Sequence, residues 1–152
     1  MPALSLSFVD DNEADHLLLQ DALDDLEIST SCRHFLNADG FLAALNRREV
    51  APDAVITDLN MPGRDGFALL RALRACPAWR HLPVLVFTTS PAAQDRAQAA
   101  ALGADGYFIK PNSYSALVEE LTGMIRLVHH RAAHGHQSAA FRCITELDAT
   151  DP

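Results

Sequence analysis

Polar side chains follow four separate apolar runs of the sequence, each at the point where the run ends. In chain order they are Asp10, Asp11, Asp58, Thr88, Thr89, Ser90 and Lys110. A single polar residue at a strand end is ordinary, because polarity resumes where a buried strand stops. Four strand ends that all carry such residues indicate a shared polar site.

The residue types favour phosphoryl chemistry beside a metal ion. Three neighbouring carboxylates repel one another, and a cation between them removes that cost. Oxygen ligands with room for water suit Mg²⁺. A carboxylate is also a nucleophile toward phosphorus, which would give an aspartyl phosphate. A metal ion and a lysine can neutralise phosphoryl oxygens, and a hydroxyl such as that of Thr88 can hydrogen bond to them.

The elements expected to position these residues alternate between strand and helix. Strand-like runs lie at 4–9, 28–35, 54–57, 83–87 and 106–110. Helical spacing of apolar residues lies at 14–26, after a turn at 37–40 through Leu45, and at 67–75, 92–102 and 117–128, with Gly103 placed as a C-terminal cap. This order predicts an α/β fold: a five-stranded parallel sheet, flavodoxin-like order 2-1-3-4-5, with helices on both faces. Ligands bind outside the carboxyl ends of such strands, where the polar residues are expected.

Composition narrows the class of protein. A chain of 152 residues suits one domain, and a net charge of −8 argues against nucleic-acid binding. No run is long and apolar enough for a membrane span, and residues 1–11 lack the pattern of a signal peptide. The widely spaced Cys32, Cys76 and Cys143 predict reduced, structural thiols in a cytoplasmic protein.

Four fragments of the sequence resemble the receiver domains of two-component response regulators, in particular those of the chemotaxis-regulator type. They are FVDDNEAD, VITDLNMPGRDG, PVLVFTTS and GADGYFIKP, and together they span about residues 4–128. Their order and spacing match the family. The FTTS fragment and the segment after the fifth helix also loosely resemble the single-domain regulators of bacterial phytochromes.

The resemblance implies a role for each matching residue. Asp58 is the phosphoacceptor, and Lys110 pairs with the phosphoryl group. The implied magnesium ligands are Asp10, Asp11, Asp58 and the backbone carbonyl of Asn60.

The resemblance also implies a switch and a cis proline. Thr88 is the switch hydroxyl, and Tyr107 is the aromatic residue that moves inward with it; the alternative for Tyr107 is a half-buried strand residue. Pro111 matches a proline with a cis peptide bond after Lys110. Thr89 departs from the small residue that is common at its position, which bears on the speed of phosphorylation and hydrolysis.

The function so implied is that of a single-domain response regulator, a phosphoprotein in phosphorelay signal transduction. A sensor histidine kinase or a phosphotransfer protein supplies the phosphoryl group. The protein is not an enzyme with a separate substrate, since its magnesium-dependent phosphotransfer and dephosphorylation are self-catalysed. The alternative is a phosphoryl sink or an intermediate in a relay.

We expect two regions in the chain: a receiver domain at 1–130 and a C-terminal tail at 131–152. The tail is too short for an effector domain. The spacing of His129, His130, His134 and His136 fits no closed zinc site. Phe141, Ile144 and Leu147 could pack on a surface. We expect a homodimer through the fourth helix, fifth strand and fifth helix; the alternative is a monomer with a disordered tail.

Three other function classes fit less well. A phosphatase of the haloacid dehalogenase type needs a second aspartate where Asn60 stands. A receiver that is no longer phosphorylated would not need its full set of site residues, which is intact here: Asp10, Asp11, Asp58, Thr88 and Lys110. A nucleotide-binding flavodoxin relative needs a glycine-rich phosphate loop after the first strand, where this chain has DDNEAD.

Overall fold

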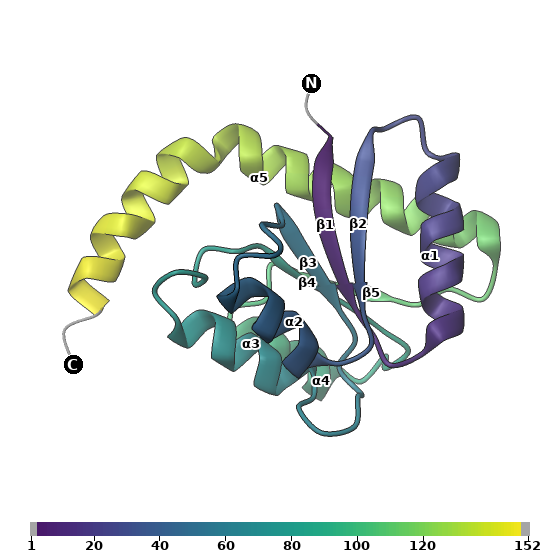
Figure 1. Cartoon of the computed structure of the whole chain (residues 1–152), viewed down its shortest axis with the longest axis horizontal. Coiled ribbons are helices and arrows are strands. Elements are labelled where there is room, and N and C mark those ends of the chain that lie inside the picture. The colour runs from purple at the N-terminus through teal and green to yellow at the C-terminus, as the bar shows by residue number, and fades with distance from the viewer. Residues whose placement is uncertain (1–2, 150–152) are drawn as a thin grey trace.

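Five parallel strands form one sheet in the order β2-β1-β3-β4-β5, which confirms the predicted fold class and order (Figure 1). The computed structural model describes the backbone of residues 3–149 and the side chains of residues 3–131. The strands are β1 (Leu4–Val9), β2 (Thr30–Phe35), β3 (Ala54–Thr57), β4 (Val84–Thr88) and β5 (Gly106–Ile109). All five carboxyl ends therefore lie at one edge of the sheet.

Helices cover both faces of the sheet. They are α1 (Glu13–Asp25), α2 (Ala38–Asn46), α3 (Gly66–Ala75), α4 (Ala93–Ala101) and α5 (Tyr114–Ala149). The buried clusters place α1 and α5 on one face and α2, α3 and α4 on the other (Figure 1). Within residues 3–149, no helix combines the length and the apolar character that crossing a membrane requires.

Successive side chains of the central strands point to opposite faces of the sheet and so contribute to both layers of the core. Ile56 faces the layer that contains residues of α1 and α5, and its neighbour Val55 faces the layer that contains residues of α2 and α3. Successive strand side chains point to opposite faces, so a strand covered on both sides must be apolar at every position. Every residue of β3 and β4 is buried, which holds the carboxyl ends of these two strands in fixed positions.

Local capping residues set the boundaries of the helices. Asn12 caps α1, and its side-chain oxygen accepts hydrogen bonds from the backbone N–H groups of Ala14 and Asp15. Gly103 follows α4 with a positive φ of 95°, and its N–H donates to the Ala100 carbonyl. The predicted C-terminal cap at Gly103 is therefore confirmed.

The fifth helix extends beyond the region that the sequence suggested. Its backbone continues without a break through the boundary expected at residue 130 and reaches Ala149, past the edge of the sheet (Figure 1). The side chains of His134, His136 and Cys143 lie outside the described residues. The same holds for Phe141, Ile144 and Leu147, whose expected packing stays a prediction.

Candidate functional site

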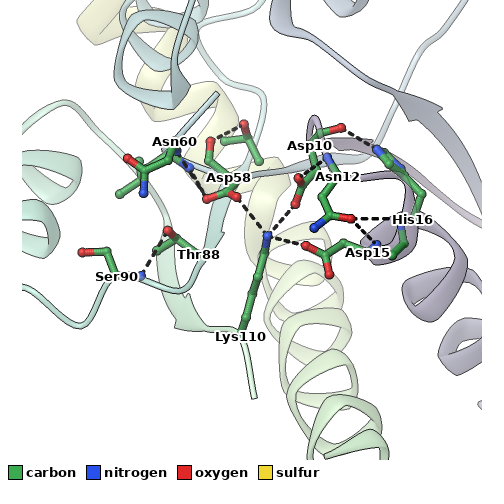
Figure 2. A network of polar contacts seen from close by, with 12 residues as sticks. Asp10, Asn12, Asp15, His16, Asp58, Asn60, Thr88, Ser90 and Lys110 are labelled. Carbon is green, nitrogen blue, oxygen red and sulfur yellow. Dashed lines mark hydrogen bonds and ion pairs between the residues drawn. The ribbon is translucent and has the colours of Figure 1, made fainter. Parts of the chain in front are cut away.

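The carboxyl edge of the sheet brings together the polar residues that the sequence placed at the strand ends. Asp10 follows β1, Asp58 follows β3, Thr88 is the last residue of β4, and Lys110 follows β5. Figure 2 shows the Lys110 side chain reaching across this edge toward Asp10 and Asp58. Parallel strand order accounts for this convergence, because β1 and β4 flank β3, and β5 lies beside β4.

The Lys110 ammonium contacts three carboxylates. Its Nζ lies 2.6 Å from Asp10 Oδ2, 2.9 Å from Asp58 Oδ2 and 2.7 Å from Asp15 Oδ2. An ammonium has three N–H donors, so these contacts use all of them. Only 11% of the Lys110 side chain is exposed, and the ion pairs therefore lie largely out of bulk water. Charge-assisted hydrogen bonds of this kind are among the strongest that a side chain makes.

Burial and charge act in opposite directions on the ionisable groups of the site. Burial would lower the pKa of Lys110, but the hydrogen bonds to Asp10, Asp15 and Asp58 outweigh it and raise that pKa. Burial raises the pKa of Asp10, while the hydrogen bonds from Lys110 and from the Asn12 N–H oppose that rise. Lys110 is thus held firmly in the charged form, whereas the buried Asp10 carries a cost for its charge.

Three carboxylates at this edge have the donor chemistry of a magnesium site. Oxygen atoms of Asp10, Asp11 and Asp58 lie within 4.8 Å of one another. Asp10 and Asp58 are buried and Asp11 is exposed, so the cluster opens to solvent on one side. Lys110 supplies one positive charge against these three negative charges. An oxygen-only donor set with an open side and surplus negative charge fits Mg²⁺, which keeps several of its waters.

The backbone after β3 folds around the Asp58 carboxylate. Asp58 Oδ1 accepts hydrogen bonds from the backbone N–H groups of Leu59 at 2.7 Å and Asn60 at 3.4 Å. Asp58 Oδ2 faces Lys110 instead. Gly66 closes the turn, since its N–H donates to the Leu59 carbonyl at 3.0 Å. The aspartate at the end of β3 is therefore fixed at both oxygens, while the role of the Asn60 carbonyl stays a prediction.

A hydrogen-bonded path links the end of β4 to β5. Thr88 is buried, and its hydroxyl oxygen accepts the backbone N–H of Ser90 at 3.3 Å. The carbonyl of Ser90 accepts the Tyr107 hydroxyl at 2.8 Å. The Arg96 guanidinium of α4 lies 4.7 Å from the centroid of the Tyr107 ring. Thr88 and Tyr107 are thus linked by two hydrogen bonds through Ser90.

The expected cis peptide between Lys110 and Pro111 is wrong. The described residues contain no cis peptide bond. The trans form is the default, favoured by about 0.5–1 kcal/mol even before proline. With this trans bond Lys110 still reaches all three carboxylates, so the direction of the side chain does not require the cis form.

Three residues at the site were absent from the sequence prediction. Asp15 contacts Lys110 from the first turn of α1. His16 Nε2 lies 2.7 Å from the Asp10 carbonyl oxygen, and His16 Nδ1 lies 2.7 Å from His34 Nδ1 (the first contact is drawn in Figure 2). An acidic residue in the first helical turn after a polar strand end was the available signal, because helical side chains lean toward the N-terminus. No sequence pattern pairs His16 with His34.

The fold and the site define a class: a flavodoxin-like α/β domain whose sheet edge carries an acidic cluster with the donor chemistry of a metal site, and a facing lysine. The response regulator receiver domain model matches residues 6–122. The chain therefore belongs to the response regulator receiver family.

Similar proteins include chemotaxis and phytochrome-associated regulators. Chemotaxis protein CheY-3 of Vibrio cholerae is 34% identical over 119 residues, which cover 78% of this chain and 88% of that protein. The phosphorylated cyanobacterial phytochrome response regulator RcpA superposes with a TM-score of 0.75 at 26% identity, covering 81% of this chain and 91% of that one. The Mn²⁺-bound response regulator Rcp1 gives a TM-score of 0.73 at 25% identity, with 80% and 91% covered. Both resemblances drawn from the sequence are confirmed.

Proposed function

We propose that this protein is a single-domain response regulator that accepts a phosphoryl group on Asp58 and signals through a surface that changes on phosphorylation. The observation that carries the proposal is the contact of Asp58 Oδ2 with Lys110 Nζ at 2.9 Å, beside Asp10 and Asp11. A nucleophilic carboxylate, a cation for the phosphoryl oxygens and an acidic metal site are the parts that phosphoryl transfer needs. The comparisons do not favour the alternative of a phosphoryl sink.

The transfer step uses the Asp58 carboxylate as nucleophile. One of its oxygens attacks phosphorus, a new O–P bond forms, and the bond from phosphorus to the donor breaks, with its electron pair leaving on the donor. The Leu59 and Asn60 N–H groups hold the carboxylate in place for this attack. Lys110 pairs with a phosphoryl oxygen. No side chain needs to move a proton for the aspartyl phosphate to form.

Asp10, Asp11 and Asp58 would hold the magnesium ion, together with the Asn60 backbone carbonyl. When bound, Mg²⁺ neutralises the charge on phosphoryl oxygens and offsets the repulsion among the carboxylates. The Mn²⁺-bound form of the similar response regulator Rcp1 supports a divalent cation at such a site. The excess of carboxylates over cations at this edge is the corresponding feature here.

The donor in this proposal is a phosphohistidine of a sensor histidine kinase or of a phosphotransfer protein in the cytoplasm. Thr88 senses the phosphoryl group and passes the change to Tyr107 through Ser90. The affected face comprises α4, β5 and α5. Only Ala99 of α4 is buried, so most of this helix is free to contact a second subunit.

Incubation with acetyl phosphate and magnesium tests the phosphoacceptor. We expect wild type to gain one acid-labile phosphoryl group, and Asp58→Asn to gain none. Removal of magnesium with a chelator should also prevent labelling. Asp21→Asn is the matched control, because Asp21 is an exposed aspartate of α1. Labelling of Asp58→Asn equal to wild type would disprove the assignment.

Sedimentation tests the proposed homodimer, and with it the expected boundary at residue 130. The full chain and a version that ends at His130 are compared, each with and without beryllium fluoride as a phosphoryl mimic. We expect the full chain with the mimic to dimerise. Four monomeric samples at high concentration would mean that the α4, β5 and α5 face serves a different partner.

A further inference from the structure

Asp15 contacts Lys110 from a different element than the other two carboxylates. Asp10 and Asp58 follow strands of the sheet, whereas Asp15 lies in the first turn of α1. Its side chain is 26% exposed, compared with 0% for Asp10 and 10% for Asp58. Asp15 is therefore the most exposed of the three carboxylates, and Figure 2 shows it reaching the Lys110 ammonium from a different side than Asp58.

The local structure of α1 explains why Asp15 points at the site. The Asn12 side chain caps the helix, and its Oδ1 accepts a hydrogen bond from the Asp15 N–H at 3.4 Å. This bond fixes Asp15 in the first turn. Side chains of a helix lean toward its N-terminus, and here the N-terminus begins at the carboxyl end of β1. The Asp15 carboxylate is thereby carried back over the sheet edge, 2.7 Å from Lys110 Nζ.

A cation on the acidic cluster would change the balance of contacts at Lys110. Asp10 and Asp58 belong both to the carboxylate cluster and to the set that contacts the ammonium, so a divalent ion and Lys110 compete for them. Asp15 is outside that cluster. Of the three carboxylates, only Asp15 can keep its whole contact with the Lys110 ammonium while the other two turn toward a metal ion.

We propose that Asp15 is a positioning residue for Lys110, which anchors the ammonium at the site while a divalent cation occupies Asp10, Asp11 and Asp58. This inference rests on the proposed function for its purpose, since the anchored ammonium is then in place for a phosphoryl group on Asp58. Without Asp15, the Lys110 ammonium has only Asp10 and Asp58 as ion-pair partners, and it competes more strongly with the cation for these two carboxylates. Asp15 thus favours binding of the cation by acting through Lys110.

A double-mutant cycle with Mg²⁺ alone separates this role from a simple effect of charge. We expect Asp15→Asn to weaken Mg²⁺ binding about fivefold. The charge-assisted contact between Asp15 and Lys110 is lost, and Lys110 then competes with the ion for Asp10 and Asp58. Glu13→Gln is the matched control: it removes an exposed negative charge from the same helical turn and should change binding by less than about twofold. In a Lys110→Gln background, Asp15→Asn should also have less than about a twofold effect. An Asp15→Asn effect that persists in that background would overturn the proposal.

The lysine content of the chain allows a second readout that needs neither metal nor phosphorylation. Lys110 is the only lysine among the 152 residues, so ¹⁵N-lysine labelling gives a single ammonium signal. We expect hydrogen exchange of this ammonium with water to be at least about fivefold faster in Asp15→Asn than in wild type or Glu13→Gln. Equal exchange in the three proteins would overturn the proposal. A wild type that resists phosphorylation would instead contradict the proposed function and leave the exchange comparison decisive for Asp15.

Discussion

The Tyr107 hydroxyl donates a hydrogen bond to the backbone carbonyl of Ser90 at 2.8 Å. Through its N–H, the same Ser90 contacts the hydroxyl oxygen of the buried Thr88 at 3.3 Å. Ser90 thus joins a residue at the carboxyl edge of the sheet to a half-buried aromatic ring on β5. A phosphoryl oxygen that accepts the Thr88 O–H would turn this hydroxyl and alter the bond that it accepts from the Ser90 N–H, so a change at Thr88 should reach Tyr107.

Replacing Thr88 by alanine should separate phosphorylation from the response. Thr88→Ala keeps Asp58, Lys110 and the acidic cluster, so we expect it to accept phosphate from acetyl phosphate. It should lose the phosphorylation-induced NMR shifts of Tyr107, because the hydroxyl that we propose to contact the phosphoryl group is gone. Thr89→Ala, at an exposed neighbouring position, is the control and should keep them. Wild-type shifts in Thr88→Ala would rule out coupling through this hydroxyl.

Removing the ammonium of Lys110 should make stability depend more strongly on magnesium than it does in wild type. Lys110→Met leaves Asp10 buried without its cation, and breaking a buried ion pair costs about 3–5 kcal/mol. We expect magnesium to restore part of this loss, because it neutralises the same carboxylates. Urea denaturation with and without magnesium measures both effects.

The control for that loss is a surface pair. Arg64 and Asp39 lie 2.8 Å apart with 42% and 75% of their side chains exposed, and Arg64→Met should cost less than about 1 kcal/mol. Equal losses of unfolding free energy in Lys110→Met and Arg64→Met would show that burial does not strengthen the Lys110 ion pairs.

Gly66 is required where α3 begins against the chain at Asp58. A Cβ atom at this position would lie 2.2 Å from the Asp58 carbonyl oxygen and 2.8 Å from Leu59 Cα. Both are backbone atoms, so Gly66→Ala should cost about 1–3 kcal/mol and displace the loop after β3 that carries Asp58. Gly123→Ala in α5 meets nothing within 4 Å and should be neutral or stabilising by about 0.5–1 kcal/mol. Thermal denaturation of the two variants compares these outcomes, and equal effects would contradict the steric argument.

The contact between His16 and His34 should make stability fall in mild acid. Partial burial and the neighbouring His16 lower the pKa of His34 below its usual 6.5. The unfolded chain then takes up a proton at a higher pH than the folded one, so stability is full above about pH 6.5 and is lost as pH falls through the lowered pKa. Two charged rings would also break the 2.7 Å contact between the Nδ1 atoms, since one nitrogen must accept.

Urea midpoints measured from about pH 8 to pH 5 check this dependence. We expect His34→Gln to reduce this pH-dependent loss of stability by less than about 1 kcal/mol, because His34 is exposed. His129→Gln in α5 is the control for losing any one histidine. A slope in His34→Gln identical to that of wild type would exclude this pair as the source.

Much of this protein could be predicted from local sequence patterns. Val55 and Ile56, apolar on both faces of a short run, predict a central parallel strand, and Asp58 directly after the end of that strand predicts the acidic edge. Gly103 was identified as a helix cap because only a residue that tolerates positive φ fits there. Such features depend on a few neighbouring residues, which is why the sequence alone determines them.

The tertiary structure decided which side chains meet across the sheet edge. Asp15 and Lys110 are 95 residues apart, and their contact depends on the angle at which α1 leaves β1 beside the end of β5. His16 and His34 meet because β2 pairs with β1, and neither residue type signals this in the sequence. The Lys110–Pro111 bond is trans, although the family resemblance implied cis. Contacts between distant segments depend on packing geometry to within about an ångström, and no local pattern of residues carries that information.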